Sequence, residues 1–454
     1  MDHPRSKLPA VLAILFCIAL LGGVGVLLWK TLPEKQQPQQ AETIQTDSVF
    51  SSEQTAVEPE REAPYEGELP EQAEAAQPEQ PDSEQPSEPA ADPAAPNDAS
   101  VTDAQKTAQA TLASMTEDEK LWQLFFVTPE AITNVNTATV AGEATKNALA
   151  QYPVGGIVYF AKNLEDRAQA AALLANTQSY AKIPLFLGVD EEGGTVSRIG
   201  ANEALGGTKV ADMRSFGQSA DPAQVYAAGQ TLAANLTGLG FNLDFAPDCD
   251  VVSGVDSVIG SRSFGSDPDL CASLAGVIVK SLRAEGVVSC LKHFPGYGSA
   301  TVDDHNGTSI VEKTLDELES CDLVPFQSII AQEGSVPFVM VTHLSYPNVT
   351  GSDTPADLSS AIVTDILRDK LGYQNVIITD SQSMSSITDH YSAGEAAVQA
   401  LAAGCDMILM PSDLQGAFDA VKAAVADGTL TQSRIDESVL RILTVKAEYG
   451  ILQK

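Results

Sequence analysis

The chain has 454 residues, of which 44% are hydrophobic and only 6% are aromatic, so a large and mostly aliphatic core can form. Its formal net charge of −35 argues against nucleic acid as a partner, because phosphate binding requires Lys and Arg. The six cysteines are widely spaced and mostly lie among apolar residues, which favours buried thiols over a disulfide scaffold, with one disulfide remaining an alternative.

Residues 9–29 contain no charged side chain, and a helix of ~20 apolar residues crosses the hydrocarbon core of a membrane. Arg5 and Lys7 precede this run and no clear small-residue cleavage site follows it. This pattern favours an uncleaved signal anchor in residues 1–30 over the alternative, a cleaved signal peptide. Both interpretations place the rest of the chain outside the cytoplasmic membrane.

Residues 31–100 hold 17 acidic residues, two basic residues and 11 prolines. Such a segment has too few apolar side chains to build a core. We therefore predict a disordered linker, extended by its prolines and by charge repulsion.

Residues 101–454 are predicted to form one catalytic domain. Thr116 and Glu119 form a capping box, which predicts a helix immediately after Thr116. Eight short apolar runs then alternate with Ala-rich helical segments, a pattern typical of parallel strands buried on both faces. The runs are residues 124–127, 156–160, 185–190, 241–246, 287–293, 337–343, 375–380 and 406–410, and the helical segments include 166–182, 222–239, 315–333, 359–371 and 393–403. Eight such units predict an α/β fold of the (β/α)8 TIM-like barrel type, with a doubly wound open sheet as the alternative.

Most of these runs end in polar or ionisable residues. Asp190, His293, His343 and Asp380 each stand at the end of a predicted strand. In a barrel, the C-terminal strand ends and the loops after them carry the active site. We therefore expect these strand ends to share one functional face.

The stretch 292–305, KHFPGYGSATVDDH, combines a strand end, a Gly/Pro loop and an Asp-x-His pattern. The spacing lets Asp303 accept a hydrogen bond from one imidazole nitrogen of His305. The other nitrogen is then free to exchange a proton with a substrate. With an unperturbed pKa of about 6.5, either form of the imidazole is accessible.

This stretch resembles the loop of the glycoside hydrolase family 3 β-N-acetylglucosaminidases, which reads approximately K-H-F-P-G-H-G…D-S-H. Residues 376–384, VIITDSQSM, resemble the nucleophile motif of that family, and residues 188–198, GVDEEGGTVSR, resemble its substrate-binding loop. Segments 242–247 and 258–264 also match. The resemblance spans about residues 115–450 and its motifs occur in the family's order.

The resemblance implies a retaining exo-β-N-acetylglucosaminidase that hydrolyses terminal β-linked N-acetylglucosamine in cell-wall muropeptides or glycoconjugates through a covalent glycosyl-enzyme. It implies that Asp380 is the nucleophile and that His305, oriented by Asp303, is the general acid and then the general base. The residues that would hold the sugar in the −1 site are Asp190, Arg198, Arg262, Lys292 and His293. We expect no metal or cofactor, because the chain has only five histidines and no H-x-H or H-E-x-x-H pair. The expected partners are a 2-acetamido sugar and, through the N-terminal helix, the membrane; the protein is expected to be a monomer.

Four positions depart from the family pattern: Tyr297 replaces a usual His, Glu191 a Gln, Thr195 a common Arg, and Asp304 a Ser. We expect Tyr297 and Glu191 to lie in the sugar cavity and to alter its preference. We expect His343 to be either a supporting residue next to the site or a core histidine, and not a member of the main site. The alternatives that remain open are a β-glucosidase-type or phosphorolytic activity and a non-catalytic glycan-binding wall protein.

Overall fold

The computed structural model describes residues 102–252, 254, 257–300, 309–332 and 336–452. The predicted signal anchor in residues 1–30 and the predicted linker in residues 31–100 lie outside these residues. Within the described ranges, no helix combines the length and the apolar character needed to cross a membrane.

Eight parallel strands close into a barrel in the order β1-β10-β9-β8-β7-β6-β3-β2. Each strand overlaps one of the eight predicted apolar runs, so the barrel prediction is confirmed and the open-sheet alternative is wrong. The strands are β1 (Phe125–Val127), β2 (Gly156–Val158), β3 (Phe186–Val189), β6 (Leu243–Asp244), β7 (Val288–Phe294), β8 (Phe338–Val341), β9 (Val376–Ser381) and β10 (Met407–Leu409).

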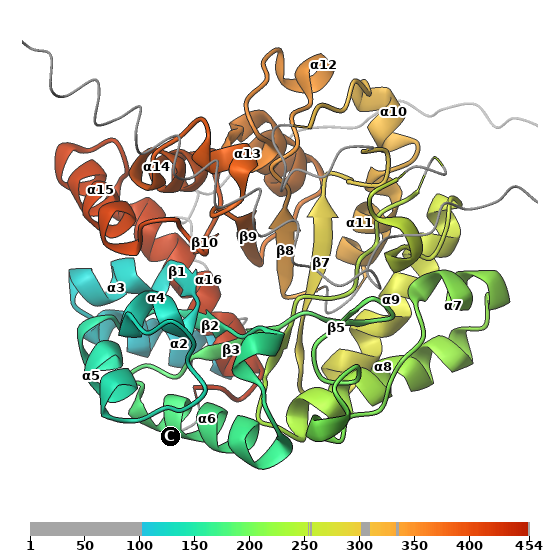
Figure 1. Ribbon diagram of the computed structural model, residues 1–454. Helices are drawn as coiled ribbons and strands as arrows, with labels where there is room; N and C mark the ends of the chain where they lie inside the picture. The colour runs from blue at the N-terminus through green and yellow to red at the C-terminus, as the bar shows by residue number, and fades with distance from the viewer. Residues whose placement is uncertain (1–101, 253, 255–256, 301–308, 333–335, 453–454) are drawn as a thin grey trace, which may run out of the picture. The chain divides into compact units, whose positions relative to one another are not determined.

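Helices surround the barrel (Figure 1). Thr116 caps α3 (Glu117–Gln123) through the predicted capping box with Glu119. Three further helices lie within predicted segments: α6 (Arg167–Tyr180), α8 (Pro222–Thr237) and α14 (Ala393–Ala403). The α-helices outside the predicted segments are α2 (Asp103–Ser114), α4 (Pro129–Thr133), α5 (Glu143–Gln151), α7 (Met213–Ser219), α9 (Pro268–Ala284), α12 (Pro347–Thr350), α13 (Ser385–Thr388), α15 (Leu414–Asp427) and α16 (Gln432–Glu448).

Two predicted helical segments differ in detail from the structure. The segment 315–333 forms two helices, α10 (Leu315–Glu319) and α11 (Leu323–Ile330), instead of one. The segment 359–371 is wound as a π-helix, η6 (Ala361–Lys370).

Aromatic rings fill the barrel interior. Phe126 meets Phe245 edge to face, with 5.2 Å between ring centroids. A Cβ added to Gly156 would lie 2.5 Å from the Phe126 ring, and one added to Gly188 would lie 2.9 Å from it. The two glycines therefore make room for a large side chain in a closely packed interior.

A two-stranded antiparallel hairpin, β4 (Glu191–Gly193) and β5 (Val196–Ser197), follows β3. Gly193 at the end of β4 has φ 86° and Gly194 in the turn has φ 58°, a backbone conformation that glycine adopts without steric cost. The hairpin thus begins directly after Asp190, at the C-terminal end of β3.

Candidate active site

A cavity of about 570 Å³ opens among the C-terminal strand ends. Six of the predicted site residues line it: Asp190, Arg198, Arg262, Lys292, His293 and Asp380. They lie at or next to the C-terminal ends of β3, β7 and β9, directly after β5, and in the short helix η3 (Gly260–Arg262). The predicted acid–base residue His305 and its partner Asp303 lie outside the described residues.

Glu192, a residue that the sequence analysis did not identify, joins two cations of the cavity, the buried Lys292 and the partly buried Arg262. Its Oε1 lies 2.6 Å from Lys292 Nζ, and Arg262 donates two hydrogen bonds of 2.8 Å to its carboxylate. Burial raises the pKa of Glu192, but the charges of Arg262 and Lys292 outweigh it and hold that pKa well below its usual range. The carboxylate is therefore ionised in the folded protein.

Lys292 also contacts Asp190, with 3.0 Å between Nζ and Oδ1. Burial lowers the pKa of Lys292, but the charges of Glu192 and Asp190 outweigh it and raise the pKa above its usual value. Lys292 thus remains an ammonium although its side chain is only 2% exposed. The wall of the cavity consequently carries fixed, paired charges.

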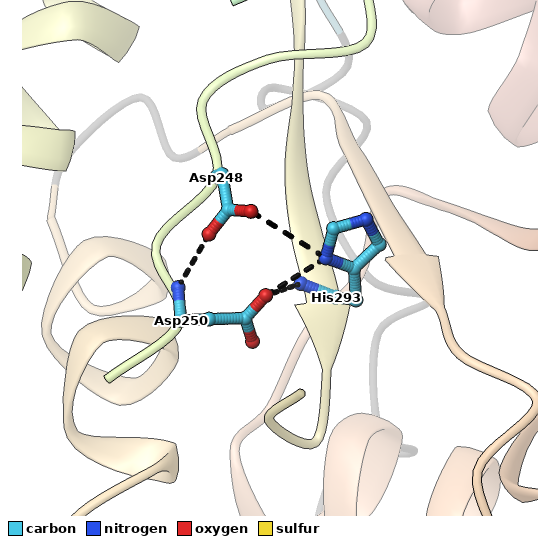
Figure 2. Close-up of side chains that lie close together, drawn as sticks. All are labelled: Asp248, Asp250 and His293. Carbon is cyan, nitrogen blue, oxygen red and sulfur yellow. Dashed lines mark hydrogen bonds and ion pairs between the residues drawn. The ribbon is translucent and has the colours of Figure 1, made fainter. Parts of the chain in front are cut away.

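Behind this wall, Asp250 holds the ring of His293 (Figure 2). His293 Nδ1 lies 2.8 Å from Asp250 Oδ2, and Asp250 Oδ1 accepts a 2.6 Å hydrogen bond from the Tyr297 amide. Burial and the nearby Arg262 lower the pKa of His293, which favours the neutral ring. Because the carboxylate accepts, we assign the proton to Nδ1, so that Nε2 becomes an acceptor, 3.4 Å from Arg262 Nη2.

Asp248, Asp250 and His293 are also the described residues that could hold a metal ion, since their ligand atoms lie within 4.8 Å of one another. A cation there would displace the proton between His293 and Asp250. It would also meet the Arg262 guanidinium, whose Nη2 lies 3.5 Å from Asp248 Oδ2. The cluster therefore fits a hydrogen-bonded support for His293 better than a metal centre.

Asp380 lies near the end of β9, and its Oδ1 accepts a 2.7 Å hydrogen bond from the Ser381 amide. Burial raises the pKa of Asp380, but electrostatic interactions with His293 and His343 and the hydrogen bond from the Ser381 amide together outweigh it and bring the pKa below its usual value. The other carboxylates that line the cavity, Asp190 and Glu192, are both paired with Lys292. Among the described lining residues, Asp380 is thus the ionised carboxylate outside that ion-pair cluster.

The expectation that Glu191 and Tyr297 lie in the sugar cavity is wrong, because neither residue lines it. Glu191 is fully buried inside the hairpin, where its carboxylate accepts hydrogen bonds from the backbone amides of residues 198, 199 and 200. Tyr297 packs against the ring of His293, with 5.5 Å between ring centroids. Both residues therefore contact residues of the cavity wall without lining the cavity themselves. His343 is likewise buried and does not line the cavity.

The sequence matches the profile of the glycosyl hydrolase family 3 N terminal domain over residues 116–445. It is 34% identical to beta-hexosaminidase A of Pseudoalteromonas piscicida, over 66% of this chain and 54% of that protein. It is 38% identical to beta-hexosaminidase LpqI of Mycobacterium tuberculosis, over 58% of this chain and 68% of that protein. A family 3 β-N-acetylglucosaminidase from a Paenibacillus species superimposes with a TM-score of 0.70 at 34% identity, over 74% of this chain and 63% of that chain. The chain thus spans between about half and two thirds of these relatives.

Proposed function

The chain belongs to glycosyl hydrolase family 3, and on this premise we propose that its barrel hydrolyses terminal β-linked N-acetylglucosamine, as an exo-acting enzyme on muropeptides or glycoconjugates. The observation that carries the proposal is the ionised Asp380 at a strand end inside a cavity of about 570 Å³. Small-molecule sites commonly have volumes of roughly 300–1,000 Å³. The β-hexosaminidase relatives support the choice of a 2-acetamido sugar.

In the proposed reaction, Asp380 attacks the anomeric carbon and forms a covalent glycosyl-enzyme, which water then hydrolyses with retention of configuration. Arg262 and Lys292 donate hydrogen bonds to the sugar hydroxyls, and Asp190 and His293 Nε2 accept hydrogen bonds from them. Hydrogen bonds to charged groups are stronger than those between neutral groups. The ion pairs hold the charged side chains in place for these contacts. Arg198, which also lines the cavity, completes the proposed sugar contacts.

The leaving oxygen needs a proton donor, and Asp190 and Glu192 are poor candidates because both are ion-paired with Lys292. We therefore assign this role to His305, with Asp303 orienting its ring. The described residues on either side of the segment 301–308 are anchored near the barrel: Ala300 O accepts from the Val258 amide, and Ser309 O accepts from the Ser345 amide. Ala300, which follows β7, and Ser309, which contacts the segment after β8, are the described residues that flank positions 301–308 in the sequence.

We also propose that residues 9–29 anchor the protein in the cytoplasmic membrane, with a monomeric catalytic domain outside. The uncharged run and the preceding Arg5 and Lys7 support this topology. Protease added to intact cells should remove the domain while the first residues stay with the membrane fraction after alkaline extraction. Recovery of the whole chain from the cytoplasm would overturn the topology.

The activity is tested with chromogenic β-N-acetylglucosaminide and β-glucoside substrates, with and without phosphate. Wild type should release the 2-acetamido sugar in buffer without phosphate, whereas Asp380→Asn should lose activity by about 10³-fold or more, as expected for a removed nucleophile. Asp389→Asn, an exposed carboxylate nine residues away, is the matched control. A 2-fluoro sugar should label Asp380. No turnover of any 2-acetamido sugar, or a label on another residue, would contradict the proposal.

A further inference from the structure

A buried histidine–aspartate pair contacts the residue that follows the proposed nucleophile in the chain. His343 follows β8, and Asp357 belongs to the short helix η5 (Ala356–Leu358) in the same loop. His343 Nδ1 lies 3.0 Å from Asp357 Oδ1, and both side chains are 0% exposed. Neither residue lines the sugar cavity, so any effect of the pair on catalysis must pass through another residue.

The other ring nitrogen of His343 contacts the chain next to the nucleophile. Nε2 lies 2.9 Å from the carbonyl oxygen of Ser381, and a carbonyl only accepts, so Nε2 carries a proton. The amide of the same residue, Ser381, donates to Asp380 Oδ1 at 2.7 Å. Ser381 is thus held through its carbonyl by His343 and, through its amide, holds the carboxylate of Asp380.

Each member of the pair is the charge partner of the other. Neither carboxylate oxygen of Asp357 receives a hydrogen bond from a described residue, and a buried carboxylate costs free energy unless it is paired. His343 carries the opposite charge when both of its ring nitrogens are protonated. The other titratable groups near the pair are Asp380, Cys405, whose Sγ lies 3.5 Å from the Asp357 carbonyl, and Tyr391, whose pKa is raised by burial and then by Asp357. None of them supplies a positive charge.

We propose that the His343–Asp357 pair positions the nucleophile, because the hydrogen bond from His343 to the Ser381 carbonyl keeps Asp380 in its orientation in the cavity. His343 is a positioning residue and does not touch the substrate. The inference rests on the proposed role of Asp380 as nucleophile. A second effect has the same origin, because the charge of His343 is one of the causes that bring the pKa of Asp380 below its usual value.

Three variants separate the hydrogen bond from the charge. His343→Gln keeps a donor for the Ser381 carbonyl without the charge, His343→Leu removes both, and Asp357→Asn removes the counter-ion. We expect kcat to fall about 100-fold in His343→Leu, the size of effect typical of a small misplacement of a reacting group, with partial rescue by His343→Gln. KM should change much less. In both His343 variants, the acidic limb of the kcat/KM profile should move to higher pH, because the pKa of Asp380 rises.

Asp406→Asn is the matched control for loss of a buried carboxylate. Asp406 is also 0% exposed and contacts the same strand at its other end, through the Ile377 amide. We expect this variant to lose stability without moving the acidic limb. An unchanged kcat and acidic limb in both His343 variants, or an equal shift of the limb in Asp406→Asn, would overturn the inference.

A measurement without turnover tests the pair itself. In protein labelled with ¹⁵N-histidine, the chain's five histidines can be assigned by comparison with His343→Gln. His343 should show a protonated Nε2, the donor to the Ser381 carbonyl, and Asp357→Asn should change the Nδ1 shift, because it removes the carboxylate that lies 3.0 Å from that nitrogen. A His343 whose Nε2 carries no proton in wild type overturns the inference even if the enzyme is active. Absence of turnover with Nε2 protonated would instead count against the proposed function.

Discussion

Glu192 and Arg262 meet side-on through two hydrogen bonds of 2.8 Å, one from Nε to Oε2 and one from Nη2 to Oε1. Lys292 Nζ shares the same carboxylate, 2.6 Å from Oε1. One buried acid therefore keeps two cations in fixed places on the cavity wall. Paired, planar contacts of this kind give geometric specificity as well as energy.

Glu192→Gln keeps the shape of the side chain but leaves Arg262 and Lys292 with one negative charge fewer. Removing one partner of a buried ion pair typically costs about 3–5 kcal/mol of stability, and we expect roughly the lower figure because Asp190 still pairs with Lys292. KM for the proposed sugar should rise at least about tenfold, which corresponds to roughly 1.4 kcal/mol of binding. Steady-state kinetics and urea unfolding test this, with the exposed Glu203→Gln as control. An unchanged KM would show that Arg262 and Lys292 do not need the negative charge of Glu192 in order to bind the sugar.

Burial raises the pKa of both Asp248 and Asp250 to about 7, but the two carboxyls differ in the hydrogen bonds they accept and should respond oppositely to amide substitution. Burial, and then the charge of Asp250, raise the pKa of Asp248 to about 7. An unfolded aspartate titrates near 3.9, so from about pH 4 to pH 7 the folded state binds more protons and this group makes stability fall as pH rises. Asp248→Asn should remove that slope and stabilise the protein at pH 8.

Asp250→Asn should be destabilising, because Asp250 accepts hydrogen bonds from the Tyr297 amide and from the amide and Nδ1 of His293. An amide offers a single acceptor oxygen, so at least one donor is left unsatisfied, at a cost of about 1–3 kcal/mol. Unfolding free energies of both variants between pH 4 and pH 9 test the contrast. If Asp248→Asn loses as much stability as Asp250→Asn at pH 8, the assignment of the raised pKa to Asp248 is wrong.

Chelation of metal ions should leave the proposed activity unchanged. The potential ligand atoms of Asp248, Asp250 and His293 are occupied by a proton or face the Arg262 guanidinium. Activity after dialysis against EDTA should equal that of the untreated enzyme, and metal analysis should find less than one equivalent of bound ion. A loss of activity that Zn²⁺ restores would contradict the interpretation that Asp248 and Asp250 support His293 through hydrogen bonds and hold no metal ion.

The strands were predictable because each is buried on both faces and appears as a short apolar run. The π-helical winding of residues 361–370 was not predictable, because its apolar residues also suit an α-helix. The residues that line the cavity could be found because they stand at strand ends or in family motifs. Consecutive residues of a strand point to opposite sides, so Glu192 faces the cavity while Glu191 faces the hairpin interior. The sequence does not reveal which of the two glutamates faces the cavity.

The contacts of the buried carboxylates Asp250 and Asp406 were harder to predict, because their partners lie far away in the chain. Asp250 contacts His293 across 43 positions, and Arg368 contacts Asp406 across 38. Neither spacing matches a helix or turn pattern. Only the closure of the barrel brings these residues together.

Asp406 joins three arginines at the N-terminal end of the strands. Arg368 contacts Oδ2, and Arg441 Nη1 and Arg434 Nη1 lie 3.1 Å and 3.5 Å from Oδ1. Burial raises the pKa of Asp406, but the arginines outweigh it and lower that pKa. Asp406→Asn should therefore destabilise the protein by about 3–5 kcal/mol at pH 7.

The sign of the pH dependence follows from the lowered pKa. The stabilisation by Asp406 is complete above the unfolded pKa of about 3.9 and is lost as pH falls through the lower folded value. The difference in unfolding free energy between wild type and Asp406→Asn should consequently shrink below pH 4. Asp369→Asn, exposed and adjacent to Arg368, is the control. A constant difference down to pH 2 would contradict the ion-pair explanation.

Lys446 is a buried amine without a carboxylate ion-pair partner among the described residues. Its Nζ donates a 2.8 Å hydrogen bond to Gln123 Oε1 and lies 5.1 Å from the centroid of the Phe186 ring. Burial lowers the pKa of Lys446 to about 7. An unfolded lysine titrates near 10.4, so between about pH 7 and pH 10 the unfolded chain binds more protons and stability rises with pH.

Lys446→Met should remove this rise, with a gain at pH 7 that fades toward pH 10 and is worth on the order of 1.4 kcal/mol for each unit of pKa difference. The variant also leaves Gln123 Oε1 without its donor, at about 1–3 kcal/mol, so the slope is more informative than the absolute stability. Urea unfolding at steps from pH 6 to pH 10 measures it, and the exposed Lys280→Met should keep the wild-type slope. If Lys446→Met has the same slope as wild type, Lys446 keeps its charge in the folded barrel, stabilised by the Phe186 ring and the Gln123 amide oxygen.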